Sequence, residues 1–249
     1  ALTTGSHNTY VGYHSGSIAN TAANNTAFGA YTLDAMTTGG SNVAMGKSAL
    51  GALTTGDRNT VIGLNAGDAL TDADDNVAIG MSALTADTLG NRSVAIGKEA
   101  LASQNFETAT NSNNVAVGSF AGNALTTGTS NTLIGNEAGV SLTDATSSVY
   151  VGFLAGKFST TSAQSTFVGA QAGQGITGVK LTGNNNVAVG FKSGFLLQGA
   201  ATLNTFVGVD SGVAVTTGTG NTFVGGLAGD GTDDGAGNTA VGKSALSAN

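Results

Sequence analysis

A glycine recurs every seventeen residues along most of this chain, always inside the same short phrase. The fourteen copies are Gly12, Gly29, Gly46, Gly63, Gly80, Gly97, Gly118, Gly135, Gly152, Gly169, Gly190, Gly208, Gly225 and Gly242. A fixed short period means that each unit stacks on the one before it and buries its apolar side there. The sequence therefore predicts an all-β fold, a parallel β-solenoid (β-roll) of about fourteen 17-residue coils that forms a single repeat domain over residues 1–249.

The composition favours an ordered chain and argues against several kinds of partner. Hydrophobic residues make up 40% of the 249 residues, which is too many for a disordered chain. With eight Lys and Arg and a net charge of −7, the chain is not expected to bind nucleic acid. No run approaches the roughly 18 apolar residues of a membrane span, so we expect no direct membrane insertion in this segment. Cysteine is absent, which removes disulfides and thiolate metal sites, and we expect no cofactor.

The phrase around each glycine predicts a short strand. Counted from the motif glycine at position 0, position −4 is Asn in eleven copies and Ser in three, and position −3 is Thr or Val. Position −2 is apolar and of any size, and position −1 is Val, Ile, Phe or Met. Because side chains alternate along a strand, we expect positions −3 and −1 to share one face, and we assign that face to the coil interior. The Leu-Thr-Thr-Gly stretches, such as Leu53–Gly56, predict a second short strand or extended edge.

The repeated Asn and Gly have structural explanations. Stacked Asn side chains can form a hydrogen-bonded ladder, and an Asn tolerates unusual backbone angles at a corner. The motif glycine indicates a turn or a close approach of two backbone segments. It does not indicate a phosphate-binding loop, because no helical pattern follows it.

The apolar residues at position −2 predict that one chain is not enough. With positions −3 and −1 inside the coil, position −2 faces outward, yet all fourteen copies are apolar there. An exposed apolar stripe of this kind marks an interface, and identical chains packed about a shared axis would cover it. The sequence does not fix the number of chains. The residues expected in this trimer-packing column are Tyr10, Val61, Leu133, Tyr150, Phe167, Phe206 and Phe223.

A known type of repeat has the same pattern. Asn76-Val77-Ala78-Ile79-Gly80, with Ala83 three residues after the glycine, resembles the head repeat of trimeric autotransporter adhesins, and Ser93-Val94-Ala95-Ile96-Gly97 is similar. The Asn-Thr-x-Val-Gly-x-x-Ala-Gly copies also resemble the shafts of trimeric phage tail fibres and bacterial fibre proteins. This resemblance implies a left-handed homotrimeric β-roll on a cell or virion surface, used for attachment to a cell-surface glycan or protein receptor. Because the chain opens and closes partway through a repeat, we expect a segment of a longer extracellular fibre.

Receptor contacts are expected where the period fails. Insertions fall near residues 102–113 and 174–185, and insertions in a solenoid leave the stack as loops. The candidate contacts are Phe106 and Glu107 in the first insertion and Val179 and Lys180 in the second. A bulge that folds back on the coil is the alternative for each.

Metal binding and catalysis have little support in the sequence. Two acidic turns, Asp72–Asp75 and Asp230–Asp234, are of a kind that calcium prefers, but their spacing matches no known calcium loop, and we expect solvated turns. His7 and His14 have no clear third ligand. We expect no enzyme and assign no catalytic residue.

Two rival functions stay open beside a structural and adhesive fibre segment. An ice-binding β-solenoid would present columns of threonine, and such a column is present but broken, at Thr37, Thr54, Thr71, Thr126, Thr143 and Thr216. A glycan-degrading β-solenoid enzyme, as in a tail spike, would need a groove with paired carboxylates, which the scattered acidic residues do not supply.

Overall fold

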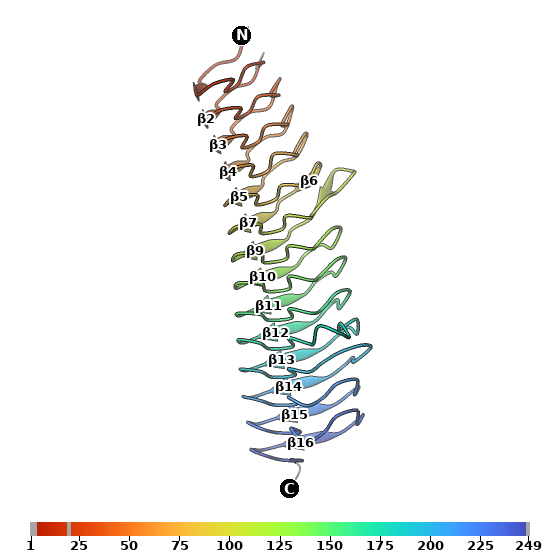
Figure 1. Cartoon of the computed structure of the whole chain (residues 1–249). Helices are drawn as coiled ribbons and strands as arrows, with labels where there is room; N and C mark the ends of the chain where they lie inside the picture. The colour runs from red at the N-terminus through yellow and green to blue at the C-terminus, as the bar shows by residue number, and fades with distance from the viewer. Residues whose placement is uncertain (1–3, 19–20, 248–249) are drawn as a thin grey trace. The chain divides into compact units, whose positions relative to one another are not determined.

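The computed structural model describes residues 4–18 and 21–247. The chain divides into two compact units, Ala1–Thr127 and Gly128–Asn249. Each unit is a parallel β-solenoid whose short strands stack one above another (Figure 1). The residues described form strands, turns and loops but no helix. The predicted all-β parallel solenoid of fourteen coils, about seventeen residues apart, is confirmed.

The strands are three residues long and coincide with the predicted phrase. In the first unit they are β1 (Thr9–Val11), β2 (Thr26–Phe28), β3 (Val43–Met45), β4 (Thr60–Ile62), β5 (Val77–Ile79), β7 (Val94–Ile96) and β9 (Val115–Val117), with the two-residue β6 (Gly90–Asn91) and β8 (Thr110–Asn111) forming a separate pair. In the second unit they are β10 (Thr132–Ile134), β11 (Val149–Val151), β12 (Thr166–Val168), β13 (Val187–Val189), β14 (Thr205–Val207), β15 (Thr222–Val224) and β16 (Thr239–Val241). Pairing is in register, so that each repeat position forms a column, for example Ala78 beside Ala95.

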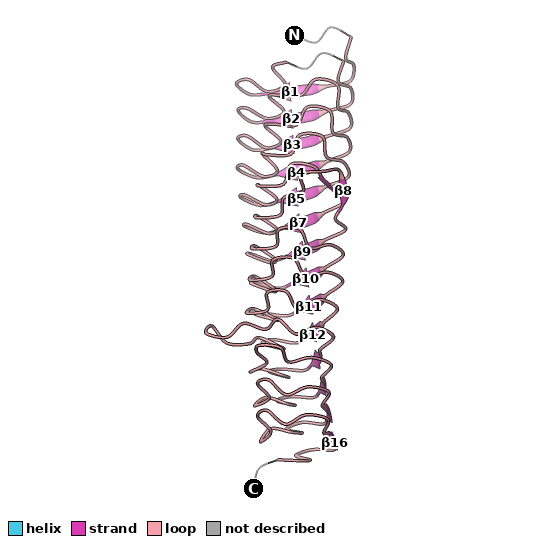
Figure 2. Cartoon of the chain, turned by 90° about the vertical axis from the view of Figure 1, so that its right-hand side faces the viewer, coloured by secondary structure: helices cyan, strands magenta, loops and turns pink. Residues whose placement is uncertain are grey.

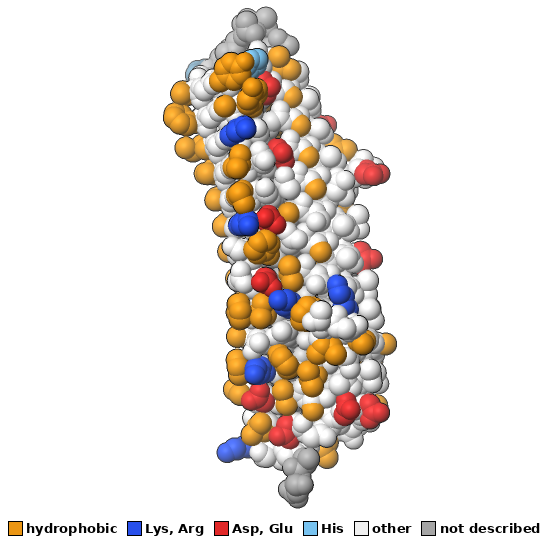
Figure 3. All heavy atoms as spheres, in the orientation of Figure 1, with side chains coloured by type: hydrophobic (Ala, Val, Ile, Leu, Met, Phe, Trp, Pro, Cys, Tyr) orange, Lys and Arg blue, Asp and Glu red, His pale blue; other side chains and the backbone are white. Residues whose placement is uncertain are grey.

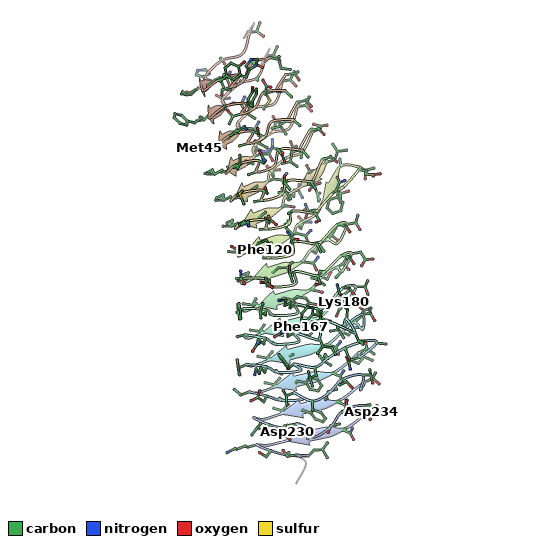
Figure 4. The ribbon with its side chains drawn as sticks, in the orientation of Figure 1. Met45, Phe120, Phe167, Lys180, Asp230 and Asp234 are labelled. Carbon is green, nitrogen blue, oxygen red and sulfur yellow. The ribbon has the colours of Figure 1, made fainter. Side chains whose placement is uncertain are left out.

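The prediction of which strand face points inward is wrong. Position −2 lies inside the coil: Val61, Leu133, Tyr150, Phe167, Phe206 and Phe223 are fully buried, and Tyr10 is half-buried. Positions −3 and −1 face outward instead. The column predicted to join neighbouring chains is therefore the core of the chain itself (Figure 4, Phe167). Within this core the rings of Tyr150 and Phe167 stack with centroids 4.7 Å apart.

The interior is filled by size compensation between positions −2 and +4. Where position −2 is Val, Leu, Tyr or Phe, position +4 is Gly; where position +4 is Leu, position −2 is Ala. At Gly156 an added Cβ would lie 2.4 Å from the Tyr150 ring, and at Gly173 it would lie 2.6 Å from the Phe167 ring. In four of the coils with Ala at position −2 the space is taken by a buried leucine at position +4: Leu33, Leu50, Leu84 and Leu101. The two positions share one packing volume, as close-packed interiors require.

The motif glycines are required by close approach of the backbone, as predicted. At Gly80 φ is +134°, and an added Cβ would lie 2.5 Å from the carbonyl oxygen of Gly97 in the next coil. Other corners take ordinary residues in the left-handed region, including Asp75, Ser82 and Leu84 with φ between 54° and 58°. Three left-handed corners in each coil turn the chain back on itself.

The predicted asparagine ladder is confirmed. The Asn59 amide Nδ2 donates to Asn42 Oδ1 at 3.0 Å and to the Ala73 carbonyl at 2.7 Å. The backbone N–H of Asn76 donates to Asn59 Oδ1 at 3.0 Å. These buried side chains connect successive coils and satisfy backbone groups that would otherwise be unpaired.

The Leu-Thr-Thr-Gly stretches form bends, not the second strand that the sequence suggested as one possibility. The leucine enters the core, and the first threonine hydroxyl donates to a carbonyl of the next coil, as from Thr54 Oγ1 to the Thr71 carbonyl at 3.0 Å. On this side β6 pairs with β8, and isolated bridges join Leu181 to Ser159 and to Gly199.

Candidate interaction surfaces

The outer strand face is the most extensive candidate surface, defined as the side chains at positions −3 and −1 of the fourteen coils. Position −1 presents Val, Ile, Phe or Met, and the exposed fractions include 57% for Phe28, 42% for Met45 and 36% for Val224. In Figure 4 Met45 points away from its coil, and Figure 3 shows hydrophobic side chains in a line along the strand edge of each unit. Position −3 adds Thr or Val in every coil.

This face has no charged residue at either position in any coil. A strand with one face in water usually alternates apolar side chains, which point into the core, with polar side chains, which point into the solvent. A monomeric protein seldom exposes a continuous surface with so few polar groups. Its uncharged side chains make it a candidate for contact with another apolar surface.

The first residues of the first insertion fold inward, against the coil. Phe106 is only 7% exposed, so this predicted receptor contact is wrong, whereas Glu107 next to it is exposed. The reason is that the Phe106 backbone N–H donates to a buried carboxylate, Asp87 Oδ1, at 3.1 Å. The following residues pair β8 with β6 before the next coil begins.

Asp87 and Gln104 replace core leucines at position +7 in two successive coils. Asp87 Oδ1 also accepts the Gly90 N–H at 3.0 Å, and Oδ2 accepts Gln104 Nε2 at 2.6 Å. Gln104 Nε2 also donates to Ser93 Oγ at 2.8 Å, and its Oε1 accepts Asn114 Nδ2 at 2.9 Å. This network takes over from the asparagine ladder where Ser93 interrupts it. Sequence reasoning missed it, although polar residues at a leucine position were a readable signal.

Burial raises the pKa of the Asp87 carboxyl, although hydrogen bonds from Gln104, Phe106 and Gly90 oppose the effect. The folded chain therefore holds this proton more tightly than the unfolded chain. Its stabilising contribution is complete below the unfolded value of about 3.8 and is lost as pH rises through the higher folded value. We expect Asp87→Asn to gain stability relative to the parent chain as pH rises across that window, measured by denaturant unfolding at a series of pH values.

Asp75→Asn is the matched control with the opposite sign. The hydrogen bond from Arg58 lowers the pKa of the Asp75 carboxyl, with Arg58 Nε 2.6 Å from Oδ1. That pair contributes stability above about 3.8 that is lost as pH falls through the lower folded value. A difference curve for Asp87→Asn that is flat, or that falls with rising pH, would show that the buried carboxyl is not destabilised by its surroundings.

The second insertion leaves the stack, as predicted. Thr177, Gly178, Val179 and Lys180 are all exposed, Val179 at 49%. Figure 2 shows this loop after β12 standing out from the neighbouring turns. Its return is fixed by Leu181, whose N–H donates to the Phe158 carbonyl at 3.1 Å. Val179 and Lys180 thus lie at the surface of this loop.

The acidic turns take part in bonding between coils. Asp74 Oδ1 accepts the Asp57 N–H at 2.7 Å, and Thr216 Oγ1 donates to Asp233 Oδ1 at 2.5 Å. Across residues 4–18 and 21–247, no group of three His, Asp or Glu side chains is arranged to hold a metal ion.

Among the described residues, His14 and Asp34 do not form a Ser-His-Asp triad. The Asp34 carboxylate lies between Ser17 and His14, with His14 Nδ1 3.8 Å from Asp34 Oδ1. A nucleophilic triad needs the histidine between the serine and the acid. The His7 side chain hydrogen bonds to its neighbour Ser6, with Nδ1 and Oγ 3.1 Å apart. Residues 4–18 and 21–247 enclose no pocket.

Comparisons with known proteins give no relative. No protein-family model, no curated protein and no solved structure matches this chain. Within the described residues no helix is long and apolar enough to span a membrane.

Proposed function

We propose that this chain is a structural and adhesive segment of an extracellular fibre on a cell or virion surface. Three copies pack through their outer strand faces into a left-handed homotrimer that acts as a rigid spacer and carries receptor contacts on its loops. The observation that carries the proposal is the uncharged outer strand face, repeated in all fourteen coils.

Association would bury the outer strand face. Each Å² of apolar surface removed from water contributes roughly 25 cal/mol. A face with two apolar or threonine side chains per coil supplies such area in every coil, and the in-register stacking of coils keeps it regular. Closed cyclic symmetry covers this face in all copies at once.

Light scattering on the purified chain tests the trimer. We expect a particle of three times the 24.1 kDa chain mass. Ile62→Asp, on the outer strand face, should shift the particle toward single chains, because an aspartate would be buried without a partner. Ala109→Asp, at an exposed position in the first insertion, is the matched control and should leave the mass unchanged. A stable single copy of the parent chain, or a dimer, contradicts the proposal.

Ice binding is the second candidate, because the outer strand face is regular and has threonine at position −3 in eight coils, such as Thr60 and Thr205. The other threonine column is less suited to order water, since hydroxyls such as Thr54 Oγ1 already donate to backbone carbonyls. A thermal hysteresis assay separates the two functions. Hysteresis from single chains, lost in Ile62→Asp, would favour ice binding over the fibre.

A further inference from the structure

Lysines and phenylalanines gather on one side of the second unit. The lysine–phenylalanine patch consists of Lys157, Phe158, Lys180, Phe191, Lys192 and Phe195. It contains three of the four basic residues between 128 and 249, in a chain with a net charge of −7. Figure 3 shows lysines next to a cluster of hydrophobic side chains over these coils, away from the strand edge.

The lysine ammonium groups lie against aromatic rings. Lys192 Nζ is 5.3 Å from the Phe191 ring centroid and 5.4 Å from that of Phe195. Phe191 is 46% exposed, so a ring face stays open beside the charge. Lys157 Nζ is 5.3 Å from the Phe158 ring and 2.7 Å from Glu137 Oε2. Within the described residues, Lys180 and Lys192 have no carboxylate at ion-pair distance.

The second insertion borders this patch. Phe158 bonds through its carbonyl to the Leu181 N–H at 3.1 Å, where the loop returns. The Gly175 N–H, where the loop leaves, donates to the Phe195 carbonyl at 2.9 Å. The loop that carries Lys180 therefore leaves and rejoins the stack between the segments of Phe158 and Phe195. Figure 4 shows Lys180 on the loop side of the second unit.

We propose that the lysine–phenylalanine patch binds an acidic oligosaccharide, a chain of sugars that carry carboxylates. Phenylalanine rings offer flat apolar surfaces to the C–H faces of pyranose rings, and ammonium groups pair with carboxylates. Lys192 lies near two phenylalanine rings, so that a charged ammonium group and apolar ring surfaces are available at one point. Lys180 places a second charge on an exposed loop. This inference rests on the proposed fibre function and specifies the receptor class of its loops.

One more polar group in the patch fits a hydroxylated ligand. Gln174 follows Lys157 in the column at position +5 and precedes Phe195. Its Oε1 is buried and has no hydrogen-bond donor among the described residues. Rotation of this amide toward the surface would offer an acceptor or a donor to a sugar hydroxyl. A nonpolar peptide ligand would have no use for this group.

Calorimetric titration of the intact chain with hexameric oligogalacturonate, hyaluronan and oligosialic acid tests the proposal. Fully methyl-esterified oligogalacturonate is the uncharged control ligand. We expect at least one acidic oligosaccharide to bind, and its Kd to rise by about tenfold in Lys192→Gln and in Phe195→Ala. Lys98→Gln, which removes a lysine 5.0 Å from the Phe120 ring in the first unit, is the matched control and should leave the Kd unchanged.

Each outcome decides the question. Binding that weakens about tenfold in Lys192→Gln and is absent for the methyl ester supports the patch. No binding of any of the three acidic oligosaccharides overturns it, as does equal binding by the Lys192→Gln variant. Binding of an oligoglutamate peptide in place of the sugars would assign the patch to an acidic protein partner and also overturn it. Light scattering on the same samples separates this failure from failure of the fibre proposal, because a trimer without sugar binding contradicts only the patch.

Discussion

Gly80→Ala should cost the folded chain about 4 kcal/mol of unfolding free energy. Two independent effects combine at this position. The φ of +134° is one that side-chain-bearing residues rarely adopt, and an added Cβ would lie 2.5 Å from the Gly97 carbonyl oxygen. That oxygen belongs to a backbone held by the coils on either side, so it cannot move away without breaking hydrogen bonds. Denaturant unfolding followed by circular dichroism measures the loss.

Gly51→Ala is the control for the same unit. Gly51 has no positive φ, and an added Cβ would lie 3.4 Å from its nearest neighbour, the Ser48 carbonyl oxygen. Other coils have a side chain at this repeat position, for example Asp34 and Asp68. We expect a change within about 0.5 kcal/mol. A loss of under about 1 kcal/mol in Gly80→Ala would mean that the close approach of successive motif glycines is not what requires them.

Phe167→Ala should cost about 3–5 kcal/mol, because it removes a fully buried ring and leaves a cavity. Gly173→Leu alone should also destabilise, because the Gly173 Cβ position lies 2.6 Å from that ring. Together the two changes recreate the Ala and Leu pair of other coils, such as Ala44 and Leu50. Leucine tolerates the backbone there, since Leu50 has φ 52° and Gly173 has φ 54°.

The double variant Phe167→Ala/Gly173→Leu should therefore recover more than half of the loss caused by Phe167→Ala. A double-mutant cycle of unfolding free energies measures the coupling. Additive losses in the double variant would contradict the shared packing volume.

The sequence was sufficient to predict every feature that depends on the seventeen-residue period. Repetition of the motif glycine placed all fourteen three-residue strands, because a fixed spacing brings the same residue of each coil into register. The asparagine ladder followed from the same repetition, as did the need for glycine at position 0. The protrusion of Val179 and Lys180 followed from the extra length of one coil.

The first insertion shows where this reasoning stopped. Its extra residues predicted an outward loop, but Phe106 is drawn inward by hydrogen bonding to Asp87, which lies nineteen residues earlier in the chain. A contact of that kind depends on which side chains face one another across coils. Asp87 stands at the repeat position of core leucines such as Leu53, but its partners Gln104 and Phe106 come from the next coil, and only the stacked structure brings them to it.

Strand alternation determined that positions −3 and −1 share a face, but it could not decide which face closes inward. That choice depends on the left-handed corners at residues such as Asp75, Ser82 and Leu84, which bend the chain toward the side of position −2. The sequence also contains an indication that position −2 faces inward, because a large side chain at position −2 goes with glycine at position +4. This pattern can be interpreted only when the two positions are known to be in contact. The repeat alone thus determined the coil and its stacking. Only the tertiary structure decided which side chains form the core, and it leaves the Val, Ile and Thr columns on the surface.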